Sequence, residues 1–168
     1  IDKFARKGIK YIIVDDFSHT LNKRTLSTQF IMAGQGNNKY ARYEALGRDT
    51  YNSIFAVADA ISGDGELPEG KCFIIIINHT MLDGDKQVFK STGKMIGNVV
   101  DPASYARIVL HSIIVPEKKG DEKYKFMIND DGMHEAKSPP EMFDTKDNYI
   151  PNNLFLALNA IEEFDNAQ

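Results

Sequence analysis

The stretch Tyr-Ile-Ile-Val-Asp-Asp, residues 11–16, joins a β-branched and aromatic run to an abrupt polar end. With Ile9 and Lys10 before it, the run covers residues 9–14 and is apolar on both faces of an extended chain. A second run, residues 71–78, has the same character and ends at His79. Runs of this kind are typical of central strands in a parallel sheet. The two runs therefore predict core strands of an α/β fold.

Around these strands the sequence contains amphipathic segments, which predict helices, and polar segments, which predict loops. Apolar residues recur at helical spacing, and Gly8 and Pro151 stand where a helix is expected to end and to begin. The helices predicted in this way cover residues 2–7, 40–62 and 150–164, the last with an Asn cap. Polar, irregular loops are expected over residues 17–39 and 83–101.

A late pair of apolar runs adds an antiparallel element. Residues 106–115 and 124–128 have strand character, and the charged segment between them predicts a hairpin. The order strand, helix, strand and late hairpin predicts a mostly parallel α/β sheet with an antiparallel C-terminal hairpin. Residues 1–168 are expected to form one domain.

Composition limits the class of protein. The 168 residues carry a formal net charge of −4, which argues against a broad nucleic-acid-binding surface but leaves room for a local basic loop. Cys72, the one cysteine, lies in an apolar run, so we expect a reducing compartment, the cytoplasm. No apolar stretch approaches the roughly 20 residues that cross a bilayer, so no membrane partner is expected.

The pair Asp15-Asp16 is the first candidate for chemistry. Ligands of open α/β sheets bind outside the carboxyl ends of the strands. A carboxylate there could hold Mg²⁺, which prefers oxygen ligands, and its neighbour could orient a water molecule. The alternative is that the two aspartates only end a strand and start a turn.

His79 is the second candidate. It follows the other core strand, so it is expected at the same rim of the sheet as Asp15. A neutral imidazole there could hydrogen-bond a phosphate or a polarised water. The alternative is a histidine that only satisfies backbone groups of its loop.

These two strand ends resemble the Walker B strand and the following sensor strand of RecA-like P-loop ATPases. More specifically, the chain is similar to the bacteriophage ATPases of the single-strand-annealing recombinase group. The segments that add to the likeness are Thr-Gly-Lys-Met-Ile-Gly at residues 92–97, the stretch 129–139 and Ile-Pro-Asn-Asn-Leu at residues 150–154. The likeness covers nearly the whole chain, although no motif in it is as specific as a Walker A loop.

The resemblance implies roles for three residues. Asp15 would bind Mg²⁺ beside ATP, His79 would sense the γ-phosphate, and Asp16 would orient water. In several RecA-like families a glutamate on an earlier strand takes that last role. If the chain is encoded by a phage, its place is the host cytoplasm.

Four lysines have roles by the same resemblance. Lys137 would be a basic finger that reaches a neighbouring subunit's nucleotide, in a homo-oligomeric ring or filament, and would neutralise phosphoryl charge. The alternative is a solvated surface lysine. The loop with Lys86, Lys90 and Lys94 would face single-stranded DNA and track its phosphates; a simple solvated loop is the alternative.

The chain departs from the family in one respect. The phosphate-binding motif G-x-x-x-x-G-K-[ST] is absent from residues 1–168. We therefore expect residues 1–168 to be the C-terminal two-thirds of a RecA-like ATPase domain whose N-terminal P-loop unit is missing here. Alone, the chain is expected not to hydrolyse ATP.

Two functions follow as hypotheses. The first is an ATPase core that, with its P-loop, acts on single-stranded DNA in phage recombination or annealing. The second is a RecA-like binding or assembly module without hydrolysis. A phosphohydrolase with Asp15 as nucleophile is a weaker third, because its usual signature separates the two aspartates by one residue.

Overall fold

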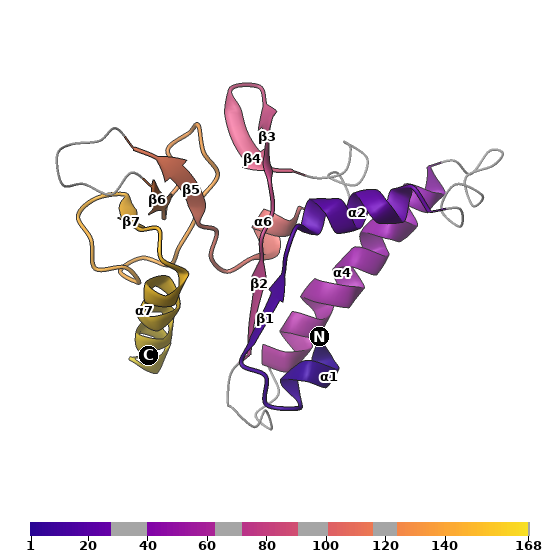
Figure 1. The fold of residues 1–168 in the computed structure, drawn as a ribbon, viewed down its shortest axis with the longest axis horizontal. Coiled ribbons are helices and arrows are strands. Elements are labelled where there is room, and N and C mark those ends of the chain that lie inside the picture. Colours follow the sequence, from indigo (N-terminus) through magenta and orange to yellow (C-terminus); the bar gives the residue numbers. More distant parts are fainter. Residues whose placement is uncertain (28–39, 63–71, 91–100, 116–123, 168) are drawn as a thin grey trace. The chain divides into compact units, whose positions relative to one another are not determined.

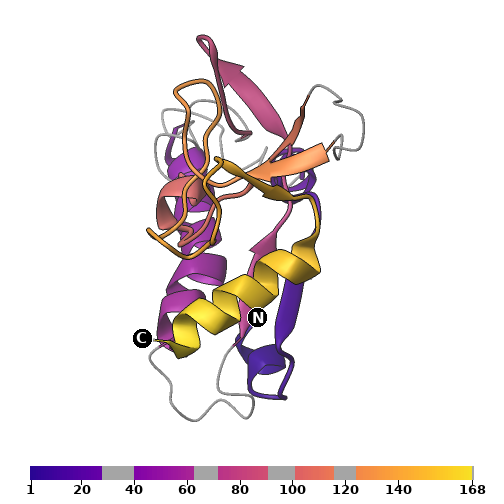
Figure 2. The ribbon, with the colours of Figure 1, turned by 90° about the vertical axis from the view of Figure 1, so that its left-hand side faces the viewer.

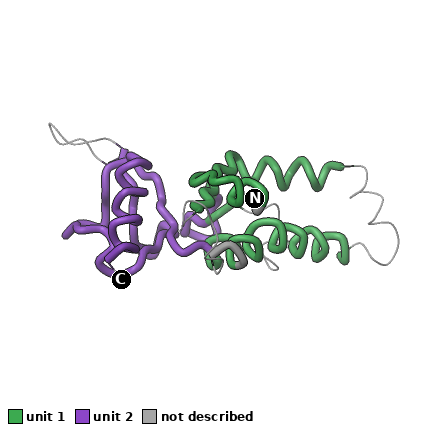
Figure 3. The backbone as a smooth tube through the Cα atoms, turned by 90° about the horizontal axis from the view of Figure 1, so that it is seen from below, with its two compact units in different colours: residues 1–80, 89–105 green, residues 81–88, 106–168 purple. Residues whose placement is uncertain are grey.

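The computed structural model describes residues 1–27, 40–62, 72–90, 101–115 and 124–167. The chain divides into two compact units, which Figure 3 colours separately. Unit 1 comprises residues 1–80 and 89–105, and unit 2 comprises residues 81–88 and 106–168. The chain is a mixed α/β protein with small sheets.

Unit 1 is built on a pair of parallel strands. β1 (Tyr11–Val14) pairs with β2 (Phe73–Ile76), in a register that runs from Tyr11 opposite Phe73 to Val14 opposite Ile76. Figure 1 shows the two strands side by side. Both predicted strands are confirmed, each shorter than its apolar run, but their central place in a core is not, because Tyr11 and Ile13 of β1 are 40% and 55% exposed and the described sheet has two strands. Because the strands are parallel and in step, their carboxyl ends share one edge.

The predicted helices of unit 1 are present. α1 (Asp2–Ala5) is followed by Gly8 at φ 78°, and α4 (Ala41–Ser62) is the long helix of Figure 1. Ala5 is buried, and Val57 of α4 packs against it. Both predicted helices are thus confirmed, α1 with its stop near Gly8 and α4 by its amphipathic spacing.

Helix α2 of unit 1 corrects a loop prediction, and helix α6 lies where no element was predicted. α2 (Phe17–Thr25) lies where residues 17–39 were expected to be irregular, and α6 (Pro102–Tyr105) precedes the third predicted strand. α2 carries few apolar residues, but Phe17 and Leu21 stand one turn apart and are buried. The rest of that predicted loop, residues 28–39, lies outside the described residues.

Unit 2 holds a three-stranded antiparallel sheet. β5 (His111–Ile114) pairs with β6 (Tyr124–Met127), which pairs with β7 (Tyr149–Pro151). The predicted hairpin is confirmed, although β5 occupies only the end of the range 106–115. The chain leaves β7 and enters α7 (Leu154–Asn166), drawn in yellow in Figure 2. The predicted Asn cap is Asn153, whose side chain accepts hydrogen bonds from the backbone N–H groups of Phe155 and Leu156.

A further hairpin lies where residues 83–101 were predicted to be a loop. β3 (Thr80–Asp83) and β4 (Lys86–Phe89) are joined by a two-residue turn, in which Gly84 has φ 62°. Glycine at the first central position is what a type II′ hairpin turn requires. Residues 91–100 of the predicted loop lie outside the described residues.

The expectation of a mostly parallel sheet is wrong. Among the strands that the structure describes, β1 and β2 form the parallel pair, and the other sheets are antiparallel. Strand character in a sequence does not give strand direction, and connection length does not decide it in this chain. Residues 128–148 join the antiparallel neighbours β6 and β7, while the segment that includes α2 and α4 joins the parallel pair β1 and β2.

Each unit has its own buried residues. The buried apolar residues of unit 1 are Ala5, Phe17, Leu21, Leu46, Phe55 and Ala103. The buried ring of Phe55 and the ring of Tyr51 join α4 to Tyr105 of α6, with centroids 5.2 Å and 5.1 Å from that of Tyr105. The buried apolar residues of unit 2 are Met127, Ile128, Ala136, Met142, Phe143, Ala157 and Ile161. No helix in the described ranges combines the length and apolar character needed to cross a bilayer.

Candidate functional site

The shared carboxyl edge of β1 and β2 carries polar residues on both strands. Asp15 and Asp16 follow β1, and Asn78 and His79 follow β2 closely. The backbone continues the pairing beyond the strands: Ile77 N–H donates to the Val14 carbonyl at 3.0 Å, and Phe17 N–H donates to the Ile77 carbonyl at 3.1 Å. This ladder holds the start of α2 beside the end of β2.

Asp16 caps helix α2. Its backbone is left-handed, at φ 48° and ψ 67°, a region that aspartate tolerates better than most residues. Its Oδ1 accepts from the Ser18 hydroxyl at 2.8 Å and from the His19 backbone N–H at 3.0 Å. The Ser18 hydroxyl, followed by the His19 N–H, lowers the pKa of Asp16 below its usual value. One oxygen of the predicted water-orienting carboxylate is therefore committed to the helix.

His79 and Asp16 meet at this edge. His79 Nε2 lies 3.6 Å from Asp16 Oδ2, an ion pair when the imidazole is protonated. Their side chains are 69% and 41% exposed. Two residues that are 63 positions apart in the sequence, both predicted as site residues, are thus neighbours in the fold.

Asn78 organises the edge, although its sequence position predicts only the end of a strand. Its Oδ1 accepts from the Ser18 backbone N–H at 2.8 Å. Its Nδ2 donates to the His79 carbonyl at 2.7 Å and to the Lys90 carbonyl at 3.0 Å. A polar amide at the end of an apolar run was the signal that could have identified it.

Asp15 is the carboxylate best placed to meet a ligand. It is exposed and lies one residue past β1. Within the described ranges, no three His, Cys, Asp or Glu side chains form a cluster that could hold a metal ion. Mg²⁺ is nevertheless often held by one or two carboxylates together with the phosphates of a substrate. Asp15 could supply such an oxygen ligand.

The three lysines predicted to face DNA belong to different parts of the chain. Lys90 belongs to unit 1, where its backbone N–H donates to the His79 carbonyl at 2.9 Å. Lys86 belongs to unit 2, where its Nζ lies 2.5 Å from Asp130 Oδ2, and this partner raises the pKa of Lys86. Lys94 lies outside the described residues. A path of the three lysines along DNA stays a prediction.

Lys137 lies in unit 2 on an extended segment. Its backbone exchanges two hydrogen bonds with Val109, at 2.8 Å and 2.9 Å, and its side chain is half-buried. The segment that carries the predicted basic finger is thus fixed to the chain just before β5.

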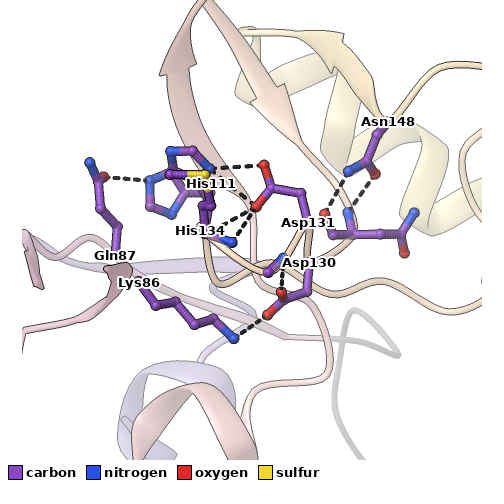
Figure 4. A network of polar contacts seen from close by, with 10 residues as sticks. Lys86, Gln87, His111, Asp130, Asp131, His134 and Asn148 are labelled. Carbon is purple, nitrogen blue, oxygen red and sulfur yellow. Dashed lines mark hydrogen bonds and ion pairs between the residues drawn. The ribbon is translucent and has the colours of Figure 1, made fainter. Parts of the chain in front are cut away.

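Unit 2 also contains a histidine cluster that was not predicted, shown in Figure 4. The rings of His111 and His134 meet edge to face with centroids 5.0 Å apart. His134 Nδ1 lies 3.0 Å from Asp131 Oδ2, and this contact is the first cause that lowers the pKa of Asp131 to about 2. Strand periodicity could indicate that His111 is buried, but nothing in the sequence pairs it with His134.

A depression of about 570 Å³ in unit 2 is lined by none of the predicted site residues. Its walls include Asn129, Pro139, Pro140 and Asn148. The candidate chemistry therefore rests on the strand ends of unit 1.

No family model, no curated protein and no solved structure matches this chain. The likeness to RecA-like phage ATPases accordingly depends on the motifs quoted above.

Proposed function

We propose that unit 1 carries the metal-binding half of a Mg-ATP site, in a RecA-like ATPase of phage DNA recombination or annealing. One observation carries the proposal: paired parallel strands bring Asp15, Asp16 and His79 to a single carboxyl edge, with His79 3.6 Å from Asp16. In an open α/β sheet this is the edge where ligands bind. The strands that resemble Walker B and the sensor strand are paired neighbours.

The residues at this edge fit the metal side of the site. Asp15 offers exposed carboxylate oxygens, and His79 offers an exposed imidazole that can hydrogen-bond a phosphate oxygen. A magnesium ion held there would neutralise charge on the phosphates. Residues 1–168 contain no phosphate-binding-loop motif, so a complete site would require the backbone N–H groups and the lysine of such a loop from another segment.

We also propose two partners, single-stranded DNA and a neighbouring subunit of the same protein. Lys90 is bonded through its backbone to the end of β2, so Lys90 and the neighbouring Lys94 are the better candidates to contact single-stranded DNA. Lys86 is a weaker candidate, because Asp130 already neutralises it. Lys137 keeps the proposed role of a finger toward a neighbouring subunit.

The test is Mg-ATP hydrolysis by a protein that joins this chain to a phosphate-binding loop, measured with and without single-stranded DNA. Asp15→Ala should lower turnover on the order of 100-fold or more, because a metal ligand stabilises transition-state charge. Asp85→Ala, which removes an exposed carboxylate from the β3–β4 turn, is the matched control and should leave turnover unchanged. Equal turnover in Asp15→Ala and in the parent protein would refute the proposal.

A non-hydrolysing RecA-like binding or assembly module is the second candidate. The observation that favours it is the commitment of Asp16 to the cap of α2. Asn caps helices as well as Asp does and tolerates the left-handed backbone, so Asp16→Asn removes the charge and keeps the cap. If Asp16 orients water, Asp16→Asn abolishes hydrolysis. Hydrolysis that survives this change assigns Asp16 to the cap alone, and absence of hydrolysis from the parent protein favours the second candidate.

A further inference from the structure

His111 occupies the junction of three segments in unit 2. It begins β5, it is only 7% exposed, and it lies opposite Met127 of β6 in the sheet. Its Nε2 lies 3.2 Å from Oε1 of Gln87 on β4. Its ring meets His134 of the extended segment that follows β6, at 5.0 Å between centroids. Figure 4 shows His111, Gln87 and His134 together with Asp131.

Backbone hydrogen bonds tie the same segments together. Gln87 N–H donates to the Met133 carbonyl at 2.7 Å, and Glu135 N–H donates to the Gln87 carbonyl at 3.0 Å. These two bonds make the bridge between β4 and His134. The two bonds between Val109 and Lys137 fix the far end of the segment. His111 therefore lies within the set of contacts that positions residues 133–137.

The loop before His134 is held by its own aspartates. Asp131 Oδ1 accepts from the backbone N–H groups of Met133 and His134 at 2.9 Å and 2.7 Å. Asp130 accepts from Gly132 N–H at 2.7 Å and pairs with Lys86. None of these contacts involves His111, so the loop positions His134 beside the His111 ring independently of the state of that ring.

Protonation of His111 opposes this arrangement. Burial is the main cause that lowers the pKa of His111, and the neighbouring His134 adds to it. The Glu135 backbone, then the Asp131 and Glu135 carboxylates, act in the opposite direction and do not reverse the shift. The facing residues on β4 and β6, Gln87 and Met127, carry no charge. A proton on His111 would put a buried positive charge beside a second imidazole.

We propose that His111 and His134 form a pH-sensitive latch, which holds β4 against residues 133–137 while His111 is neutral and releases them when His111 takes up a proton. The opened segment lets water reach the His111 ring, so the open state binds the proton more tightly than the closed state. The bonds between Lys137 and Val109 lie outside the latch, so the latch does not rest on the proposed role of Lys137.

The sign of the pH dependence follows from linkage. The pKa of His111 is lower in the closed state than its ordinary value of 6.5, so the open state binds more protons than the closed state. The closed state is therefore fully favoured above pH 6.5 and loses stability as the pH falls toward the lowered pKa. Asp131 acts in a separate window, between pH 3.8 and about 2, where loss of its charge removes its contacts to His134.

The test is amide hydrogen exchange followed by NMR on the whole 168-residue chain between pH 7.5 and pH 5, with rates corrected for intrinsic exchange. Protection of the Gln87 and Glu135 amides should fall by up to about tenfold per pH unit below 6.5, the slope for uptake of one proton. His111→Gln keeps a polar side chain without the charge change, so its protection should not depend on pH. His19→Gln, which removes an exposed histidine of α2, should respond like the parent chain.

Two results would overturn the latch: constant protection in the parent chain from pH 7.5 to pH 5, or the same loss of protection in His111→Gln. If His111→Gln does not fold, the pH titration of the His111 ring resonances in the parent chain tests the latch instead. The His111 signal must then titrate below 6.5 and together with the loss of protection. Titration at or above 6.5, or at a pH where protection is unchanged, would also refute the latch. Because this readout involves no nucleotide, its failure is separate from failure of the ATPase proposal.

Discussion

The two units of this chain each carry a polar cluster, and the clusters differ in what their side chains can still do. At the carboxyl edge of β1 and β2, Asp15 and His79 face solvent. In unit 2, His111 is buried and its partners, Gln87 and His134, belong to the same unit. An exposed edge of carboxylate and imidazole suits an incoming ligand. A buried cluster whose members already contact one another suits control of a segment's position.

The largest effects are expected from the packing below each cluster. Phe17 is 2% exposed, follows Asp16, and has its ring 5.8 Å from that of Phe89. Phe17→Ala should destabilise the chain by about 3–5 kcal/mol, because it removes a buried ring and leaves a cavity. Met127 is 0% exposed and lies opposite His111, and Met127→Ala should cost about 2–5 kcal/mol. Denaturant unfolding measures both values.

The two substitutions should reduce amide protection at different residues. Phe17→Ala should reduce amide protection around residues 15–19 and 77–79, and Met127→Ala should do so around residues 109–114. Leu26→Ala is the control, since Leu26 is 76% exposed at the end of α2 and should change stability little. Equal loss of protection in both units from either change would mean that the two clusters do not depend on separate packing.

The sequence predicted the exposed edge better than the buried cluster, for a physical reason. An apolar run that ends in a polar residue marks the end of a strand, and Asp15 and His79 were found by that rule alone. Their meeting at one edge needed only that the two strands be parallel. His111, Gln87 and His134 meet through contacts between segments that no local pattern encodes.

The fold was predicted where a local sequence pattern marks an element, and missed where none does. Amphipathic spacing located α4 and α7, and β-branched runs located β1, β2 and the β5–β6 hairpin. The helix α2 was missed because its residues are mostly polar and its start depends on the Asp16 cap and the Asn78 amide. The β3–β4 hairpin was missed because its strands are short and partly polar. The parallel sheet was overestimated, since strand character does not give strand direction.

A smaller effect is expected from Asn78→Ala. The Asn78 side chain makes three hydrogen bonds, to the Ser18 N–H and to the carbonyls of His79 and Lys90. Removing them from a partly buried place should cost about 1–3 kcal/mol and loosen His79 from α2. Asn148→Ala in unit 2 is the matched variant, since Asn148 bonds both backbone groups of Asn129. If His79 amide exchange is unchanged in Asn78→Ala, the amide does not organise the edge.

The most direct test of the proposed metal site at Asp15 is a titration of the 168-residue chain with Mn²⁺, a paramagnetic substitute for Mg²⁺, followed through NMR line broadening. We expect the amides of residues 15–19 and 77–80 to broaden first and Asp15→Asn to remove this broadening. The exposed Asp83 and Asp85 of the β3–β4 turn are the internal reference and should broaden only at higher Mn²⁺. Broadening that begins at that turn, or that persists at the carboxyl edge in Asp15→Asn, would contradict a metal site at Asp15.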